Sequence, residues 1–129
     1  MTEQTTGSQF RLGIGAADDW RMAVDACLLQ LMTLSDAANV GFVYVSDRMA
    51  DQLPRIMRRL SDATGIEAMI AACGYSIAAG ATEYCDEPVV ACLIGSVPPG
   101  AATLFRSPVE RPQGWLGVLH ADPQVPALP

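Results

Sequence analysis

The run VGFVYV, residues 40–45, constrains the fold of this chain more than any other segment. Its β-branched and aromatic residues leave no polar face, a pattern typical of a strand that is covered on both sides. A strand of this kind needs a packed layer on each face of its sheet. We therefore expect a domain of the α/β class.

Two amphipathic helices are predicted, one on each side of this strand in the sequence. The first begins after two candidate N-cap residues, Asp18 and Asp19. The second is expected to begin at its cap, Asp51, and to end at Gly65, where a left-handed residue often closes a helix. Apolar residues at the i, i+3, i+4 spacing form the two stripes: Trp20, Val24, Cys27, Leu28, Leu31 and Met32, then Leu53, Ile56, Met57 and Leu60.

The other strands are predicted from alternating or β-branched runs. These runs cover residues 10–16, 68–75, 77–84, 89–94, 103–105 and 115–120. The resulting order is β-α-β-α followed by five strands. We therefore expect a mixed β-sheet in which two β-α-β crossovers precede a β-meander, with both helices packed on one face. The other face would then lack part of its cover.

The composition fits one domain with a normal core. The chain has 129 residues, of which 50% are hydrophobic and 17% charged. We place the domain at residues 10–121, between a polar N-terminal tail, 1–9, and a Pro-rich tail, 122–129. The net charge of −6 argues against nucleic acid or an anionic membrane surface as partner, because both require a basic field.

No segment predicts export or a membrane span. The first nine residues are polar, and the weakly apolar run 68–81 is shorter than the roughly 20 residues that a bilayer span needs. The four cysteines form no CxxC pair and have no His at ligand spacing, so neither a disulfide framework nor a metal site is indicated. We expect a soluble, reduced, cytoplasmic chain without a cofactor.

Two long stretches carry a resemblance to a known family. Residues 41–68, GFVYVSDRMADQLPRIMRRLSDATGIEA, and 81–100, ATEYCDEPVVACLIGSVPPG, resemble the N-terminal domain of the FIST family (FIST N). The segments DDWRMAVDACLLQL, 18–31, and VLHADPQVPAL, 118–128, are similar to the same pattern. Together they cover roughly residues 10–128.

The resemblance implies a function without catalysis. FIST domains are described as prokaryotic sensory modules that bind small ligands such as amino acids and form the input half of signalling proteins. They sit beside a C-terminal FIST partner domain. On this basis the tail at residues 122–129 is expected to begin a linker to such a domain, and the isolated chain is expected to self-associate.

Five residues are candidates for holding the ligand: Asp47, Tyr75, Ser76, Glu83 and Tyr84. Asp47 directly follows the carboxyl end of the VGFVYV strand, and ligands of open α/β sheets collect at that edge. The others combine aromatic rings, a hydroxyl and a carboxylate near the following strands. This chemistry suits a small polar ligand that bears an amine, and the acidic net charge favours a cationic group.

Two other classes of function stay open. In the first, the chain is a small hydrolase that uses its single histidine, His120, with Cys73 or Ser76 as the nucleophile. No nucleophile motif such as GxSxG surrounds either residue, which weighs against this class. In the second, the chain is a structural half-domain that pairs with a partner domain or with itself.

Three further motifs are better explained without a ligand. Gly13-Ile14-Gly15 lacks the third glycine of a dinucleotide fingerprint, and the aspartates after it favour helix capping. The patch formed by Arg55, Arg58 and Arg59 is expected to be a solvated helix face, with Asp62 placed to pair with Arg58. The carboxylates at positions 83, 86 and 87 are expected to lie on a solvated turn, because a Ca²⁺ site needs more oxygen ligands in a tighter spacing.

Overall fold

The computed structural model describes residues 9–32, 37–105, 117, 118 and 120. Of the tails that the sequence predicts, residues 1–8 and 122–129 lie outside this part of the chain, whereas Gln9 belongs to the first strand. The elements are, in order, β1 (Gln9–Ala16), α1 (Trp20–Leu31), β2 (Val40–Ser46), the 3-10 helix η1 (Asp47–Gln52), α2 (Leu53–Thr64), β3 (Ala68–Gly74), β4 (Ser76–Ala79), β5 (Thr82–Cys85) and β6 (Val89–Ser96).

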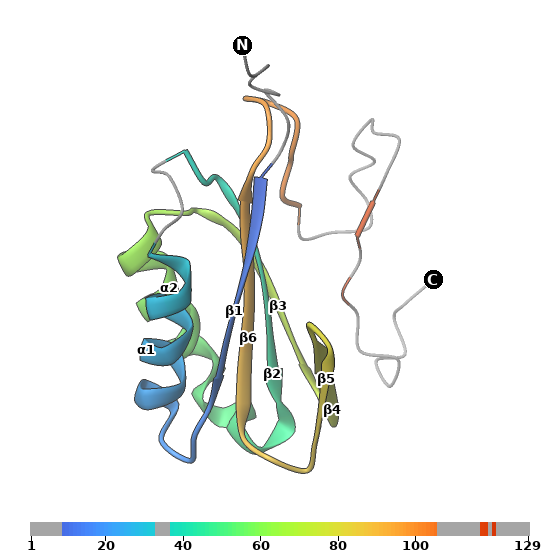
Figure 1. Ribbon diagram of the computed structural model, residues 1–129. Coiled ribbons are helices and arrows are strands. Elements are labelled where there is room, and N and C mark those ends of the chain that lie inside the picture. The colour runs from blue at the N-terminus through green and yellow to red at the C-terminus, as the bar shows by residue number, and fades with distance from the viewer. Residues whose placement is uncertain (1–8, 33–36, 106–116, 119, 121–129) are drawn as a thin grey trace.

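The described strands form two sheets. The larger has the order β1-β6-β2-β3, in which β2 and β3 are parallel and β6 runs antiparallel to both of its neighbours. The smaller is the antiparallel pair β4-β5. Both helices pack on one face of the larger sheet, and the β4-β5 hairpin lies on the other side (Figure 1). The predicted α/β class with a mixed sheet and helices on one face is confirmed.

The predicted β-meander is wrong, because β4 and β5 form a sheet of their own instead of extending the larger sheet beside β3. Strand β6 does not lie beside β5 but inserts between β1 and β2. The single strand predicted at residues 77–84 is also wrong, because Gly80 adopts a φ of 62° and turns the chain back on itself. The apolar run continues through this glycine, so the hydrophobic pattern alone does not divide the segment, although a single Gly within a strand is a signal of irregular backbone.

The last two predicted strands fare differently. Residues 101–105 form no strand, so the strand expected at 103–105 is wrong. Residues 101–105 begin with two alanines, and their apolar residues do not alternate over a stretch long enough to favour strand pairing. Of the strand expected at 115–120, residues 115, 116 and 119 lie outside the described part of the chain, and 117, 118 and 120 are not in a strand.

The main core lies between the two helices and the larger sheet. Side chains alternate along each strand, so every second residue of β2 and β6 faces the helices. The members of this layer that are fully buried or nearly so include Val24, Cys27, Val43, Val45, Ile56, Leu60, Val90, Cys92 and Ile94. The run VGFVYV is thus covered on its helix face as expected, by α1 and α2.

The other face of the sheet is partly covered by the hairpin. Ile77 and Ala79 of β4 are buried against Val89 and Ala91 of β6. The expectation that this face lacks cover is therefore only partly right, since the strands predicted to extend the sheet instead fold over it. At the start of β1, Phe10 stays 46% exposed.

The Gly13-Ile14-Gly15 motif allows α1 to lie directly on β1. A Cβ atom at Gly13 would lie 2.6 Å from the carbonyl oxygen of Cys27, and one at Gly15 would lie 1.9 Å from that of Ala23. The predicted capping is confirmed at Asp19, whose Oδ1 accepts a hydrogen bond of 2.8 Å from the Arg21 amide. The glycines therefore serve close helix packing.

The predicted C-terminal end of α2 is confirmed, and the predicted N-cap is wrong. Gly65 closes the helix as expected, with a φ of 73° and an N–H that donates to the Ser61 carbonyl at 2.8 Å. Asp51 is not the N-cap, because it lies within η1, and the cap position is held by Gln52 without a side-chain hydrogen bond. The preceding turn already supplies a carbonyl partner, that of Ala50, to the Leu53 amide.

Candidate functional site

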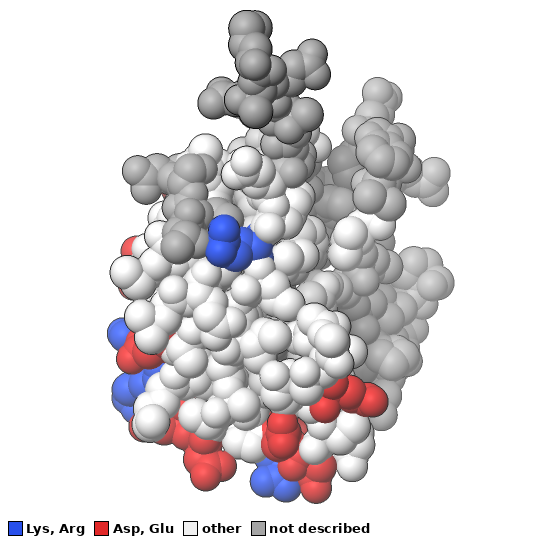
Figure 2. All heavy atoms as spheres, in the orientation of Figure 1, with Lys and Arg blue, Asp and Glu red and all other residues white. Residues whose placement is uncertain are grey.

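The carboxyl ends of β2 and β3 lie at one end of the molecule. Ser46 closes β2 and is fully buried, and its Oγ accepts a hydrogen bond of 3.0 Å from the Val89 amide at the start of β6. Asp47 follows at once as the first residue of η1 and is exposed. Acidic side chains gather at this end of the molecule (Figure 2). The position predicted for Asp47 is therefore the one that it occupies.

An ion pair joins this end of β2 to the hairpin. Arg48 contacts the Oδ1 of Asp86 through its Nη2 at 2.9 Å and its Nε at 3.3 Å. Asp86 follows β5 and has a φ of 53°, the left-handed conformation that Asp tolerates better than most residues. Asp47, by contrast, takes part in neither of the ion pairs found among the described residues. Its negative charge nevertheless acts on Arg48 and helps, after the contact with Asp86, to raise the pKa of that guanidinium.

Ser76 and Glu83 are brought together across the hairpin. The Ser76 Oγ donates to the Glu83 Oε1 at 3.0 Å, and the same oxygen lies 3.3 Å from the Cys85 Sγ. All three side chains are on the exposed side of the β4-β5 pair. Tyr75, which precedes β4, is 67% exposed. Four of the five predicted residues, counting Asp47, thus lie on the surface near this end of the sheet.

Tyr84 is the exception among the five. Neighbouring residues of a strand point to opposite faces, so Tyr84 faces away from Glu83. It is half-buried and packs with Ile77 on the inner side of the hairpin, near Leu12 and Tyr44. The sequence groups it with Glu83 because the two are adjacent in the chain, but adjacent residues of a strand point to opposite faces.

The hydrolase arrangement is not assembled among the described residues. The Nε2 of His120 lies 3.0 Å from the Tyr44 Oη, and its Nδ1 is buried without a hydrogen-bond partner in this part of the chain. Ser76 bonds to Glu83 and Cys85, and no hydrogen bond joins Cys73 to the imidazole. No three metal-ligating side chains cluster within the ranges that the structure covers.

The cysteines fall into a buried and an exposed pair, and all four are free. Burial raises the pKa of the Cys27 and Cys92 thiols to about 12 in each case, and Cys27 also donates to the Val90 carbonyl at 3.2 Å. Partial burial raises the pKa of Cys73, and the nearby Asp47 carboxylate raises it further. The pKa of Cys73 is therefore sensitive to the charge of Asp47 at the end of the sheet.

The arginine patch predicted on α2 is real, but its expected pairing is wrong. The ion pairs of the described residues do not include Arg58 with Asp62. Instead, Arg59 reaches across to Asp25 of α1, with its Nε 3.0 Å from the Oδ1. The helix pattern alone could not show this, because Asp25 lies on a different element that the fold brings alongside α2.

The comparisons with known proteins leave the family open. No protein-family model matches the chain, and no curated protein matches it either. The resemblance of residues 41–68 and 81–100 to FIST N therefore stays a prediction. None of the described helices is long and apolar enough to cross a membrane. The fold and the arrangement of its surface residues define a small mixed α/β domain with polar groups gathered at one end of its sheet.

Proposed function

We propose that this chain is a small-molecule-binding domain of the sensory type, without catalysis of its own. The ligand we propose is small and polar, carries an amine, and is exemplified by an amino acid. It binds at the end of the sheet formed by η1 and the β4-β5 hairpin. The observation that carries the proposal is the exposure of Asp47, Ser76 and Glu83 near one end of the fold, with an exposed tyrosine beside them.

The chemistry of these groups suits an ammonium ion. Carboxylate oxygens accept charge-assisted hydrogen bonds from an amine, and these bonds are about twice as strong as neutral ones. The exposed ring of Tyr75 offers a π-face to a cation. Arg48 forms its ion pair with Asp86 rather than with Asp47, and the carboxylates of Asp47, Glu83 and Asp86 outnumber this guanidinium.

The hydrolase alternative has less support. Its general base would be His120, whose Nε2 faces the Tyr44 hydroxyl rather than a nucleophile. The Ser76 hydroxyl donates a hydrogen bond to Glu83 and not to an imidazole that could activate it. The half-domain alternative is favoured by the exposed apolar side chains on the outer side of α1, Met22 and Leu29, which are 64% and 69% exposed.

The experiment is a thermal scan with a panel of amino acids, polyamines and nucleosides. A ligand held at 100 times its dissociation constant adds about 2.7 kcal/mol of stability. For a domain of this size that corresponds to a rise in Tm of about 10 °C. Asp47→Asn and Glu83→Gln should reduce the rise, whereas Glu67→Gln, an exposed carboxylate just before β3, should leave it unchanged.

Two results would count against the proposal. If a ligand stabilises all three variants equally, the site lies elsewhere. If no member of the panel raises the Tm, while light scattering at low micromolar concentration shows an oligomer, the structural half-domain becomes the better account.

A further inference from the structure

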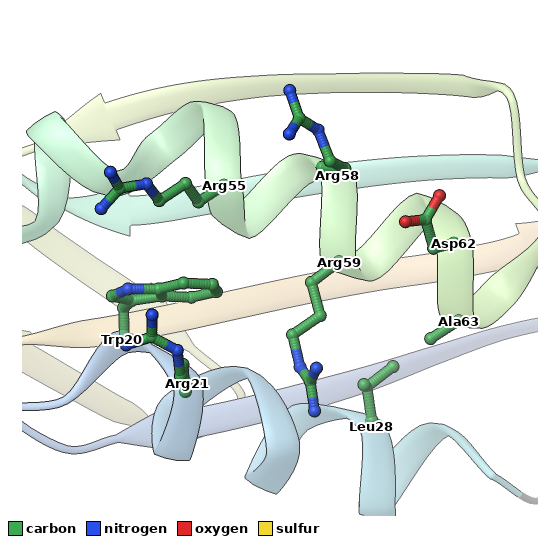
Figure 3. Close-up of a pocket in the computed structure, with 8 residues that line it drawn as sticks. All are labelled: Trp20, Arg21, Leu28, Arg55, Arg58, Arg59, Asp62 and Ala63. Carbon is green, nitrogen blue, oxygen red and sulfur yellow. The ribbon is translucent and has the colours of Figure 1, made fainter.

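A groove of about 580 Å³ runs between α1 and α2, away from the end of the sheet discussed above. Its volume falls within the range of small-molecule sites, roughly 300–1,000 Å³. Figure 3 shows side chains from both helices around it, with Trp20 and Leu28 on the α1 side and arginines along α2. Trp20 and Leu28 are half-buried and pack against the main core, so they give the groove an apolar base.

The charge of the groove is opposite to that of the protein. Arg21, Arg55, Arg58 and Arg59 line it together with a single acidic residue, Asp62, and Arg59 is also paired with Asp25 of α1, which leaves two positive charges on a chain whose net charge is −6. Four of the eight basic residues of the chain therefore lie around one groove. A concentration of this kind attracts anions locally even on an acidic protein.

Most of this charge is not neutralised by the protein. Of the four arginines, only Arg59 belongs to an ion pair of the described residues. Arg55 donates to the neutral amide oxygen of Gln52 at 3.0 Å. Arg21 lies over the Trp20 ring, 4.7 Å from its centroid. Arg58 points outward from α2 in Figure 3 and is in neither ion pair.

The Trp20 ring adds a surface for a planar group. In Figure 3 the indole is seen nearly edge-on, with Arg21 on one side of it and Arg55 on the other. A flat ring placed on the Arg55 side would stack on the indole while its acidic substituent meets guanidinium groups. Stacking of a base on an aromatic side chain contributes roughly 1–3 kcal/mol.

We propose that this groove binds a mononucleotide, with the base stacked on the Arg55 side of Trp20, the phosphate held by Arg55, and Arg21 supporting the indole from its opposite face (Figure 3). A phosphate monoester carries about −1.5 to −2 charges at pH 7 and matches the fork of a guanidinium. The site goes beyond the proposed function, because it takes an anion where the end of the sheet takes an amine.

Quenching of Trp20 fluorescence provides the measurement. Trp115→Phe removes the emission of the second tryptophan, and excitation at the red edge of tryptophan absorption avoids adenine. The probes are AMP, adenosine and inorganic phosphate at low salt. We expect AMP to quench Trp20 with saturation, and adenosine and phosphate each to bind at least tenfold more weakly than AMP. Raising the salt concentration should weaken AMP binding, because the arginines are exposed.

Three substitutions locate the site. Arg55→Gln and Arg21→Gln should each weaken AMP binding about tenfold, which corresponds to about 1.4 kcal/mol. Arg11→Gln is the matched control, because Arg11 is an exposed arginine on β1 outside the groove. It should leave AMP binding within twofold. All three substituted arginines are exposed, and the Tm of each variant verifies that it is folded.

The proposal is overturned by any of three results. AMP could fail to bind at millimolar concentration, Arg11→Gln could weaken AMP as much as Arg55→Gln, or phosphate could bind as tightly as AMP, which would leave only a simple anion site. Asp47→Asn separates this proposal from the earlier one, since it should not weaken AMP binding. Loss of the amine response with AMP binding intact is the result expected if both sites exist, whereas an unchanged amine response with AMP binding intact would rule out the first site and leave this one standing.

Discussion

Replacement of Gly15 by alanine tests the close contact between β1 and α1. The added Cβ would lie 1.9 Å from the Ala23 carbonyl oxygen and 2.6 Å from its carbonyl carbon. Ordinary contact begins at 3.4 Å, so the helix would have to move away by about 1.5 Å. The obstacle is backbone, and a backbone atom cannot escape by a change of rotamer.

The cost follows from what this movement would disturb. Val24 and Cys27 of α1 are fully buried against the sheet, and a displaced helix loses part of that packing. Overpacking of a core typically costs 1–3 kcal/mol. Because the blocked atoms belong to the helix backbone itself, we expect Gly15→Ala to cost about 3 kcal/mol. This is a large share of the 5–15 kcal/mol by which domains are usually stable.

Urea unfolding measures this loss. With an m value of about 2 kcal/mol/M, the midpoint should fall by about 1.5 M. Gly65→Ala is the control, because its Cβ would meet nothing within 4 Å and the only penalty is the φ of 73°. That penalty is about 1–2 kcal/mol. A smaller loss for Gly15→Ala than for Gly65→Ala would refute the packing argument.

Three further predictions concern the thiols and the charge beside them. Thiol titration without reductant should label Cys73 and Cys85 quickly in the folded protein and all four cysteines after unfolding, and a total of two would contradict the free state of the thiols. In a Cys85→Ser background, Asp47→Asn should speed alkylation of Cys73 at pH 8, because loss of the nearby negative charge lowers the pKa of that thiol; an unchanged rate would separate the two residues. The free energy of unfolding should fall between pH 9 and pH 12 by about 1.4 kcal/mol per pH unit for each of Cys27 and Cys92. Burial raises the pKa of these thiols in the folded protein from 9.0 to about 12, so the unfolded chain loses the protons first. A free energy of unfolding that urea melts show to be constant across this range would contradict the prediction.

The candidate site shows where a reading of the sequence succeeds and where it fails. Asp47 was placed correctly, because the end of a buried strand can be read from the end of its apolar run. Tyr84 was not, since β5 points it to the face opposite Glu83, where it packs against the sheet, and only the fold decides which face of the hairpin is covered. The ion pair of Arg48 with Asp86 was also missed, because 38 residues separate the partners in the chain.

The sequence by itself determined the features of this protein that depend only on local interactions, namely its helices, their ends and its buried strand. The spacing of apolar residues set both helices, the αL preference of Gly65 ended one of them, and Asp19 capped the other. These features depend on residues within one or two helical turns, so they can be predicted from the local sequence without knowledge of the tertiary structure. The buried character of residues 40–45 was equally local, and it indicated the α/β class.

Only the tertiary structure decided which elements became neighbours. The insertion of β6 between β1 and β2 depends on pairing between residues 45 to 87 positions apart in the chain, and no local pattern encodes that choice. The same holds for the groove between α1 and α2, where Trp20 meets arginines more than 30 residues away in the chain. Pairings of this kind are selected by the total burial and backbone hydrogen bonding of the whole domain. Local sequence patterns therefore indicate the helices and strands, whereas the tertiary structure determines which of their side chains come together on the surface.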